Sequence, residues 1–197
     1  MKNMMMKKGV MAVLGAICSV SVAQAQFGDF GGGAVIGGGY LDKPGTAYGF
    51  GQLRGKFYED DSVAHTVFLE VLGHQDDAEI VYRGPGGGFF FEDGDISFVN
   101  VTLNYELEAK LAGPFSLYAG GGIGAEFVSL DDRFDYELDT DTNFVAQVFG
   151  GVRTNFPGGL VGQAGVRYIF RDDFSLLGDQ FYTEDSVAFE LSFGFQF

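Results

Sequence analysis

The residues in this chain that could take part in chemistry are two histidines and a large excess of carboxylates. His74 ends an alternating stretch and is followed by Gln75, Asp76 and Asp77, a setting in which a hydrolase could place the histidine of a Ser-His-Asp site. No G-x-S-x-G motif and no second convergent motif accompanies it. We therefore predict no catalytic residue, and hydrolysis of lipid or peptide is the least favoured alternative.

The carboxylates include one stretch that begins like a calcium-binding loop, DTDTNF at 139–144. Phe144 occupies the position where such a loop needs glycine, and Gly150 the position of its bidentate glutamate. The stretch is therefore not an EF-hand. We predict no metal ligand set and no cofactor, and we leave open whether the clustered carboxylates bind divalent cations weakly.

In several stretches of the chain every second residue is apolar, and charged side chains occupy many of the positions in between. Both signs occur among them, and glycines are interspersed, a composition that suits a narrow interior in which opposite charges pair. The pattern predicts a lumen charge network that consists of Arg54, Lys56, Glu70, Glu106, Glu126, Arg153, Arg167 and Glu190.

The elements that must position these charges are strands, because apolar and polar residues alternate along the chain with a period of two. The clearest case is 96–110, where apolar residues from Val99 to Ala109 alternate with Asn, Thr, Glu and Lys. Eight such stretches are predicted as strands: 33–40, 46–58, 63–74, 96–110, 115–130, 142–156, 160–171 and 186–197.

The connections between these strands alternate in length, except that the link at 41–45 (LDKPG), on the side of the long loops, is short. Tight turns rich in Gly, Pro, Asp and Ser are predicted at 59–62, 111–114 and 157–159. Long segments at 75–95, 131–141 and 172–185 carry most of the acidic residues and are expected to be loops. Short turns at one end and long polar loops at the other are typical of an up-and-down barrel in an outer membrane.

Residues 1–25 have the pattern of a secretory signal peptide, so we predict one domain over 26–197. Lys2, Lys7 and Lys8 precede an apolar stretch that ends on Ala23-Gln24-Ala25. Without the signal the chain has 9 basic and 27 acidic residues and no cysteine. This acidity makes a nucleic-acid partner unfavourable, and no later stretch reaches the roughly 20 apolar residues of a membrane helix.

The ending FELSFGFQF, together with the signal peptide and the eight alternating stretches, resembles the eight-stranded outer-membrane β-barrel family. This family includes the OmpA membrane domain, OmpX-like proteins and opacity-type surface proteins. The resemblance implies an assembly signal read by the outer-membrane assembly machinery, made of Phe189, Leu191, Phe193, Phe195 and Phe197. It also implies outer-membrane lipid and lipopolysaccharide as surroundings.

The predicted fold is therefore all-β, an eight-stranded antiparallel up-and-down transmembrane β-barrel in the bacterial outer membrane, with both termini on the periplasmic side. The expected role is structural or in surface interaction through acidic extracellular loops, around a lumen filled by paired charges. A narrow porin-like channel for small solutes is the alternative, and a secreted soluble β-barrel is less favoured. The oligomeric state stays open.

Overall fold

The computed structural model describes residues 31–83, 89–132, 137–176, 179–181 and 184–196, with side chains for 31–76, 96–129, 140–173 and 184–196. Residues 1–30 and Phe197 lie outside the described residues. The signal peptide, the domain boundary at residue 26 and the role of Phe197 in the assembly signal therefore stay predictions. Within the described part of the chain, no helix has the length and apolar character needed to cross a membrane.

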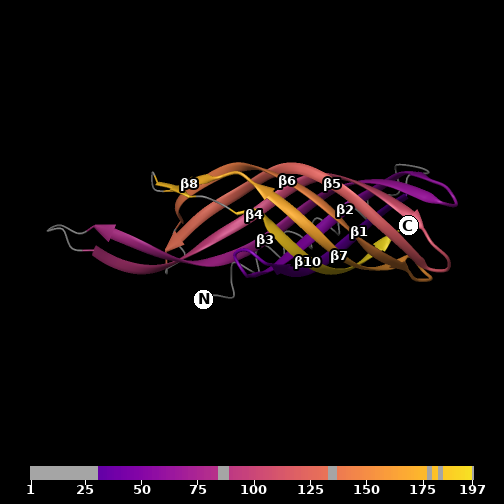
Figure 1. Cartoon of the computed structure of the whole chain (residues 1–197), viewed down its shortest axis with the longest axis horizontal. Coiled ribbons are helices and arrows are strands. Elements are labelled where there is room, and N and C mark those ends of the chain that lie inside the picture. Colours follow the sequence, from indigo (N-terminus) through magenta and orange to yellow (C-terminus); the bar gives the residue numbers. More distant parts are fainter. Residues whose placement is uncertain (1–30, 84–88, 133–136, 177–178, 182–183, 197) are drawn as a thin grey trace.

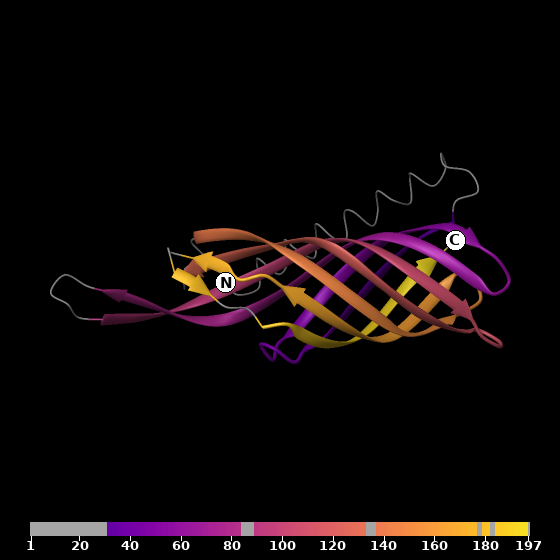
Figure 2. The ribbon, with the colours of Figure 1, turned by 45° about the horizontal axis from the view of Figure 1, so that its top comes forward.

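In the described residues, eight antiparallel strands close into a barrel, in the spatial order β1-β10-β7-β6-β5-β4-β3-β2 (Figures 1 and 2). The barrel strands are β1 (Gly31–Leu41), β2 (Ala47–Glu59), β3 (Val63–Arg83), β4 (Phe89–Lys110), β5 (Phe115–Asp132), β6 (Glu137–Asn155), β7 (Leu160–Arg171) and β10 (Ser186–Gln196). Each strand pairs with its neighbour in sequence, and β10 also pairs with β1 from Gly33↔Gln196 to Leu41↔Ala188. The predicted antiparallel up-and-down barrel is confirmed.

Tight turns join β2 to β3, β4 to β5 and β6 to β7 at the end of the barrel where β10 finishes (Figure 2). In the first of these turns, Asp60 Oδ1 accepts hydrogen bonds from the backbone amides of Ser62 and Val63, at 2.7 and 2.8 Å. Gly113, Gly158 and Gly159 in the other two turns have φ between 72° and 86°, a conformation that favours glycine. We call this end of the barrel the turn end and the opposite end the loop end.

At the loop end the strands run further than the sequence predicted. The expected loop 75–95 is largely strand, because β3 continues to Arg83 and β4 begins at Phe89, and the two form a ribbon beyond the barrel (Figure 1). The expected loop 131–141 contains the end of β5 and the start of β6, and 172–185 contains a small hairpin, β8 (Phe174–Leu176) and β9 (Asp179–Phe181). Backbone pairing between adjacent strands extends through these acidic stretches because every second residue of such a ribbon can face water.

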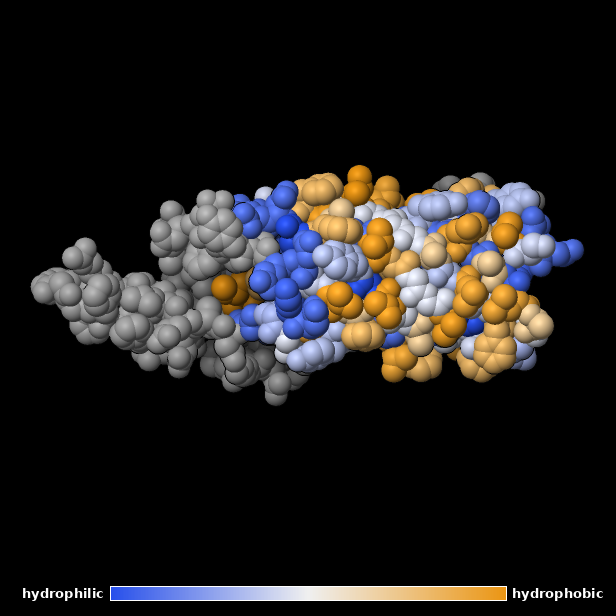
Figure 3. Space-filling view, in the orientation of Figure 1, coloured by the Kyte–Doolittle hydropathy of each residue, from blue (hydrophilic) through white to orange (hydrophobic). Residues whose placement is uncertain are grey.

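Apolar side chains cover the outside of the barrel, and polar or small ones point inward. Leu103, Ile123 and Leu191 are among the most exposed apolar residues, at 59%, 61% and 64%. Figure 3 shows such residues distributed over the barrel body, between more polar ends. This arrangement inverts that of a water-soluble protein.

Inside, layers of apolar and aromatic side chains accompany the charges. Phe68, Tyr118 and Phe149 form one buried cluster, and a second contains Tyr48, Phe50 and Leu72. Glycines make room for them: a Cβ added to Gly165 would collide with the Tyr118 hydroxyl. The lumen is thus filled by side chains, as expected for eight strands.

Candidate functional site: the polar network across the lumen

The candidate site is the set of charged residues that the strands turn into the lumen. Strand alternation places Arg54 of β2, Glu70 of β3, Glu106 and Glu108 of β4, Arg153 of β6, Arg167 of β7 and Glu190 of β10 on the inner face, where all of them are buried. A charge that is buried in this way must be neutralised by opposite charges and hydrogen bonds.

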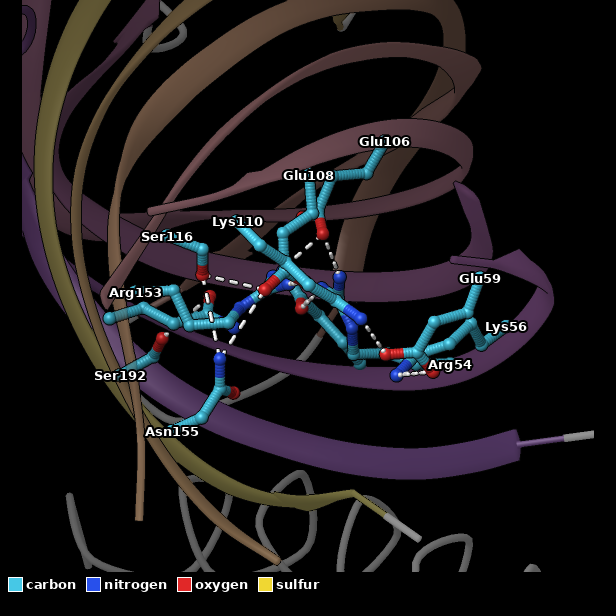
Figure 4. A network of polar contacts seen from close by, with 12 residues as sticks. Arg54, Lys56, Glu59, Glu106, Glu108, Lys110, Ser116, Arg153, Asn155 and Ser192 are labelled. Carbon is cyan, nitrogen blue, oxygen red and sulfur yellow. Dashed lines mark hydrogen bonds and ion pairs between the residues drawn. The ribbon is translucent and has the colours of Figure 1, made fainter. Parts of the chain in front are cut away.

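Toward the turn end, two arginines and two glutamates form one cluster (Figure 4). Glu106 accepts from Arg54, and also from Arg153 Nη2 at 2.7 Å. Arg153 also pairs with Glu108 through Nη1. Ser116 Oγ donates to Glu108 at 2.6 Å. The cluster therefore joins β2, β4, β5 and β6 with equal numbers of positive and negative charges.

A second cluster lies at the centre of the lumen around Arg167. Its guanidinium pairs with Glu70, where Nη2 donates to Oε2 at 2.9 Å, and its Nε donates to Glu190 Oε2 at 3.0 Å. Tyr48 also donates to Glu190 Oε2, at 3.0 Å. These contacts connect β7 to β3 and β10, so they cross the lumen as well as running along its wall.

Gln52 connects the two clusters, and Gln147 adds hydrogen bonds within the central one. Gln52 Nε2 donates to Glu70 at 2.7 Å, while Gln52 Oε1 accepts from Arg54 at 2.7 Å. Gln147 Nε2 donates to Glu70 at 2.9 Å, and its Oε1 accepts from Arg167 at 2.7 Å. The result is one continuous hydrogen-bonded network through the middle of the barrel.

Aromatic rings lie beside the arginines of this network. The Arg54 guanidinium carbon is 4.6 Å from the centre of the Phe68 ring, and that of Arg153 is 5.1 Å from the centre of the Tyr118 ring. Such contacts favour a cation in a site without bulk water. These rings were not predicted from the sequence, although Phe68 has the same inward parity as Glu70, and that parity is the signal that could have identified them.

The remaining predicted members of the network lie at its two ends. Lys56 contacts Glu59 at 2.8 Å on the turn-end rim, where Lys110 contacts the same carboxylate at 2.6 Å (Figure 4). At the loop end, Glu126 contacts Arg171 at 3.2 Å. The structure therefore does not bring Lys56 or Glu126 to the central clusters, and their partners Glu59 and Arg171 were not among the predicted residues.

The two histidines occupy different environments. His74 is buried and stacks on Phe98 with ring centres 4.6 Å apart, and neither ring nitrogen has a hydrogen-bond partner among the described side chains. His65 lies on the outer wall, where Nδ1 is 2.7 Å from the Tyr105 hydroxyl. Neither arrangement places a serine or carboxylate of the described residues against a histidine ring.

The residues predicted as an assembly signal lie on the outer face of β10, apart from Phe197, which is outside the described residues. Phe189, Leu191 and Phe193 are 62%, 64% and 68% exposed, and Phe195 is 47% exposed. Their strand closes the barrel against β1.

Comparison with known proteins gives the fold. The sequence matches no known family model and no curated protein. Among solved structures, Neisserial surface protein A and a major outer membrane protein from Thermus thermophilus each superpose with a TM-score of 0.55 at 13% identity. The alignments cover 85% of this chain and 97% and 99% of those chains. Ail of Yersinia pestis aligns at 13% identity over 85% of this chain and 98% of its own, with a TM-score of 0.48. The fold expected from the resemblance, an eight-stranded barrel like those of outer-membrane proteins, is confirmed.

Proposed function

We propose that the protein is a non-enzymatic outer-membrane barrel with a structural or surface-interaction role and a lumen that the polar network closes to solutes. The observation that carries the proposal is the inverted distribution of side chains. Large apolar residues such as Leu103 and Leu191 face outward, while Arg153, Arg167 and Glu70 are buried inside. A closed barrel of this polarity leaves no unpaired strand edge in lipid and exposes apolar side chains to it. A secreted soluble barrel would need the reverse arrangement.

The closed lumen is supported by contacts that cross it. Arg167 links β7 to β3 on the far side, and Gln52 connects its cluster to that of Arg54. Layers of aromatic and apolar side chains, including Phe68, Tyr118 and Leu72, occupy the space beside them. A solute would have to break ion pairs that are shielded from water, and this disfavours the alternative of a narrow channel.

We assign the surface role to the loop end, and we place that end outside the cell because the short turns and the end of β10 lie at the opposite rim. Acidic residues are concentrated in 75–95, 131–141 and 172–185. Contacts of these segments with lipopolysaccharide through bridging cations, or with neighbouring surfaces, fit their charge. The assembly machinery would recognise β10 by Phe189, Leu191, Phe193, Phe195 and Phe197.

Two experiments test the membrane proposal. A barrel that belongs in lipid should require detergent for extraction and refold into lipid vesicles with a strand-rich circular dichroism spectrum. A chain that stays folded and monodisperse in buffer alone would refute the proposal. Deleting Phe197 should slow insertion by the assembly machinery while the inserted barrel unfolds at the same urea concentration as wild type.

Planar-bilayer recording separates the closed barrel from the channel. We expect no steady current from inserted wild-type protein, because Arg167 pairs with Glu70 across the lumen and Glu106 joins Arg153 of β6 to Arg54 of β2. A steady current proportional to salt concentration would establish the channel instead. Assays for lipid and peptide hydrolysis on the same sample should show no turnover, and a turnover that His74→Ala abolishes would establish an enzyme.

A further inference from the structure

A shallow groove on the outer wall runs across β3, β4 and β5 in the half of the barrel nearer the turn end. Its volume is about 380 Å³, and its lining includes Val67, Leu103, Tyr105, Gly121 and Ile123. Gly121 leaves the floor bare: a Cβ placed there would meet the Gln147 backbone oxygen at 3.0 Å and Val148 Cγ1 at 3.6 Å. The four side chains around it are between 39% and 61% exposed, so the groove is open to the surroundings of the barrel.

One end of the groove continues into a polar and aromatic cluster. Tyr105 lines the groove and its hydroxyl lies 2.7 Å from His65 Nδ1. The rings of Phe57 and Tyr58 lie 5.9 and 5.3 Å from that of His65. His65 precedes Val67 on the outer face of β3, toward the turn at 60–62, so the cluster lies between the groove and the rim. Aromatic rings with polar tips at such a position are typical of a membrane interface.

We propose that the groove and this cluster together bind one phospholipid of the leaflet at the turn end, with an acyl chain along Gly121 and the phosphate near His65. This site rests on the proposed membrane location, because the groove is continuous with the apolar outer wall. The apolar half and the polar half follow one another along the barrel axis, as they do in a phospholipid. When the Tyr105 hydroxyl donates to Nδ1, the His65 ring carries its proton on Nε2 and offers a donor suited to a phosphate oxygen.

Native mass spectrometry of the barrel in detergent micelles tests the site, with phosphatidylethanolamine as the probe and diacylglycerol of the same chains as the comparison. Wild type should retain one phosphatidylethanolamine at low lipid concentration and retain diacylglycerol more weakly. Val67→Phe fills the groove from an exposed position and should weaken the first binding event about tenfold, the factor expected when about two methylene groups lose their contacts. Val152→Phe is the matched control, because Val152 is 51% exposed on the outer face of β6 and does not line the groove.

His65→Ala tests the polar half independently of the groove. It should reduce the preference for phosphatidylethanolamine over diacylglycerol and leave the binding of diacylglycerol unchanged. Equal binding of both lipids by wild type, or equal effects of Val67→Phe and Val152→Phe, would overturn the site. A dimer that Val67→Phe abolishes would also overturn it, since the occupant would then be a second copy of the chain. A barrel that needs no detergent would instead refute the membrane proposal, so the two failures are distinguishable.

Discussion

Replacing Arg167 by methionine removes the cation between two buried carboxylates at the centre of the lumen. The arginine side chain is 1% exposed, and it pairs with Glu70 and Glu190, whose side chains are 1% and 6% exposed. Methionine keeps an unbranched apolar stem and carries no charge, so the substitution removes the ion pairs together with the guanidinium that fills the space between the carboxylates.

The expected loss of stability follows from what each carboxylate retains. Glu70 keeps hydrogen bonds from Gln52 at 2.7 Å and Gln147 at 2.9 Å, and Glu190 keeps that from Tyr48 at 3.0 Å. These neutral donors do not balance two negative charges, and removing one partner of a buried pair costs about 3–5 kcal/mol. Combining Arg167→Met with Glu70→Gln removes one of the two charges, so we expect it to recover about 1–3 kcal/mol.

The assay is urea unfolding of the barrel refolded in lipid or detergent, followed by far-ultraviolet circular dichroism. The control is Lys43→Met, because Lys43 contacts Glu184 at 2.9 Å on the loop-end rim with both side chains more than half exposed. This variant should unfold at the same urea concentration as wild type, since exposed pairs are screened by water. A loss below about 1 kcal/mol for Arg167→Met, the range of exposed pairs, would refute the argument that the lumen pairs are shielded from water.

Two further predictions concern the turn end and the inner wall. Hydrogen bonds from the amides of Val63 and Ser62 lower the pKa of Asp60 below its usual value of 3.8, so its contribution to stability is present above that value and is lost as the pH falls through the lowered pKa. The difference in unfolding midpoint between wild type and Asp60→Ala should therefore shrink on acidification, and a difference that is independent of pH would contradict this. Gly165→Ala should destabilise by about 1–3 kcal/mol in the same urea assay because its Cβ has no space. Gly162→Ala, whose Cβ would meet nothing closer than 3.6 Å, should be nearly neutral, and equal losses for the two variants would contradict the steric explanation.

The barrel could be predicted because the alternation of side chains is set by local sequence. The period of two fixes which residues share a face, and the tight turns fix which strands are neighbours. The loop-end boundaries were wrong for a related reason. Residues 75–83 continue β3 as a strand, but most of their apolar residues fall on the opposite parity from Val67 and Leu69. Their acidic residues were therefore interpreted as a loop, whereas polar side chains are also compatible with a two-stranded ribbon that leaves the barrel.

The sequence predicts which charged residues face the lumen better than it predicts which of them pair with one another. Glu70 and Arg167 lie 97 residues apart on strands that are not neighbours. Their contact depends on strand tilt and on the stagger between strands, which accumulate around the whole barrel. The same stagger brings Arg171 of β7 to Glu126 of β5. Alternation identifies a charged residue as inward-facing, but it does not give its height along the barrel axis.

The two faces of this barrel should therefore respond differently to substitution. An outward leucine such as Leu103 passes from water into lipid when the barrel folds, so its truncation costs roughly the transfer free energy of the atoms removed, about 0.8 kcal/mol per methylene group. An inward residue such as Glu106 is held by Arg54 and Arg153, and its loss removes the carboxylate that both share and leaves Arg153 paired with Glu108 alone. The polar interior is therefore constrained by specific partners, while the outer wall tolerates the exchange of one apolar side chain for another where only lipid touches it. An outer-wall position with little room for a Cβ, such as Gly121, where it would lie 3.0 Å from the Gln147 backbone oxygen, is the place where a specific contact is expected.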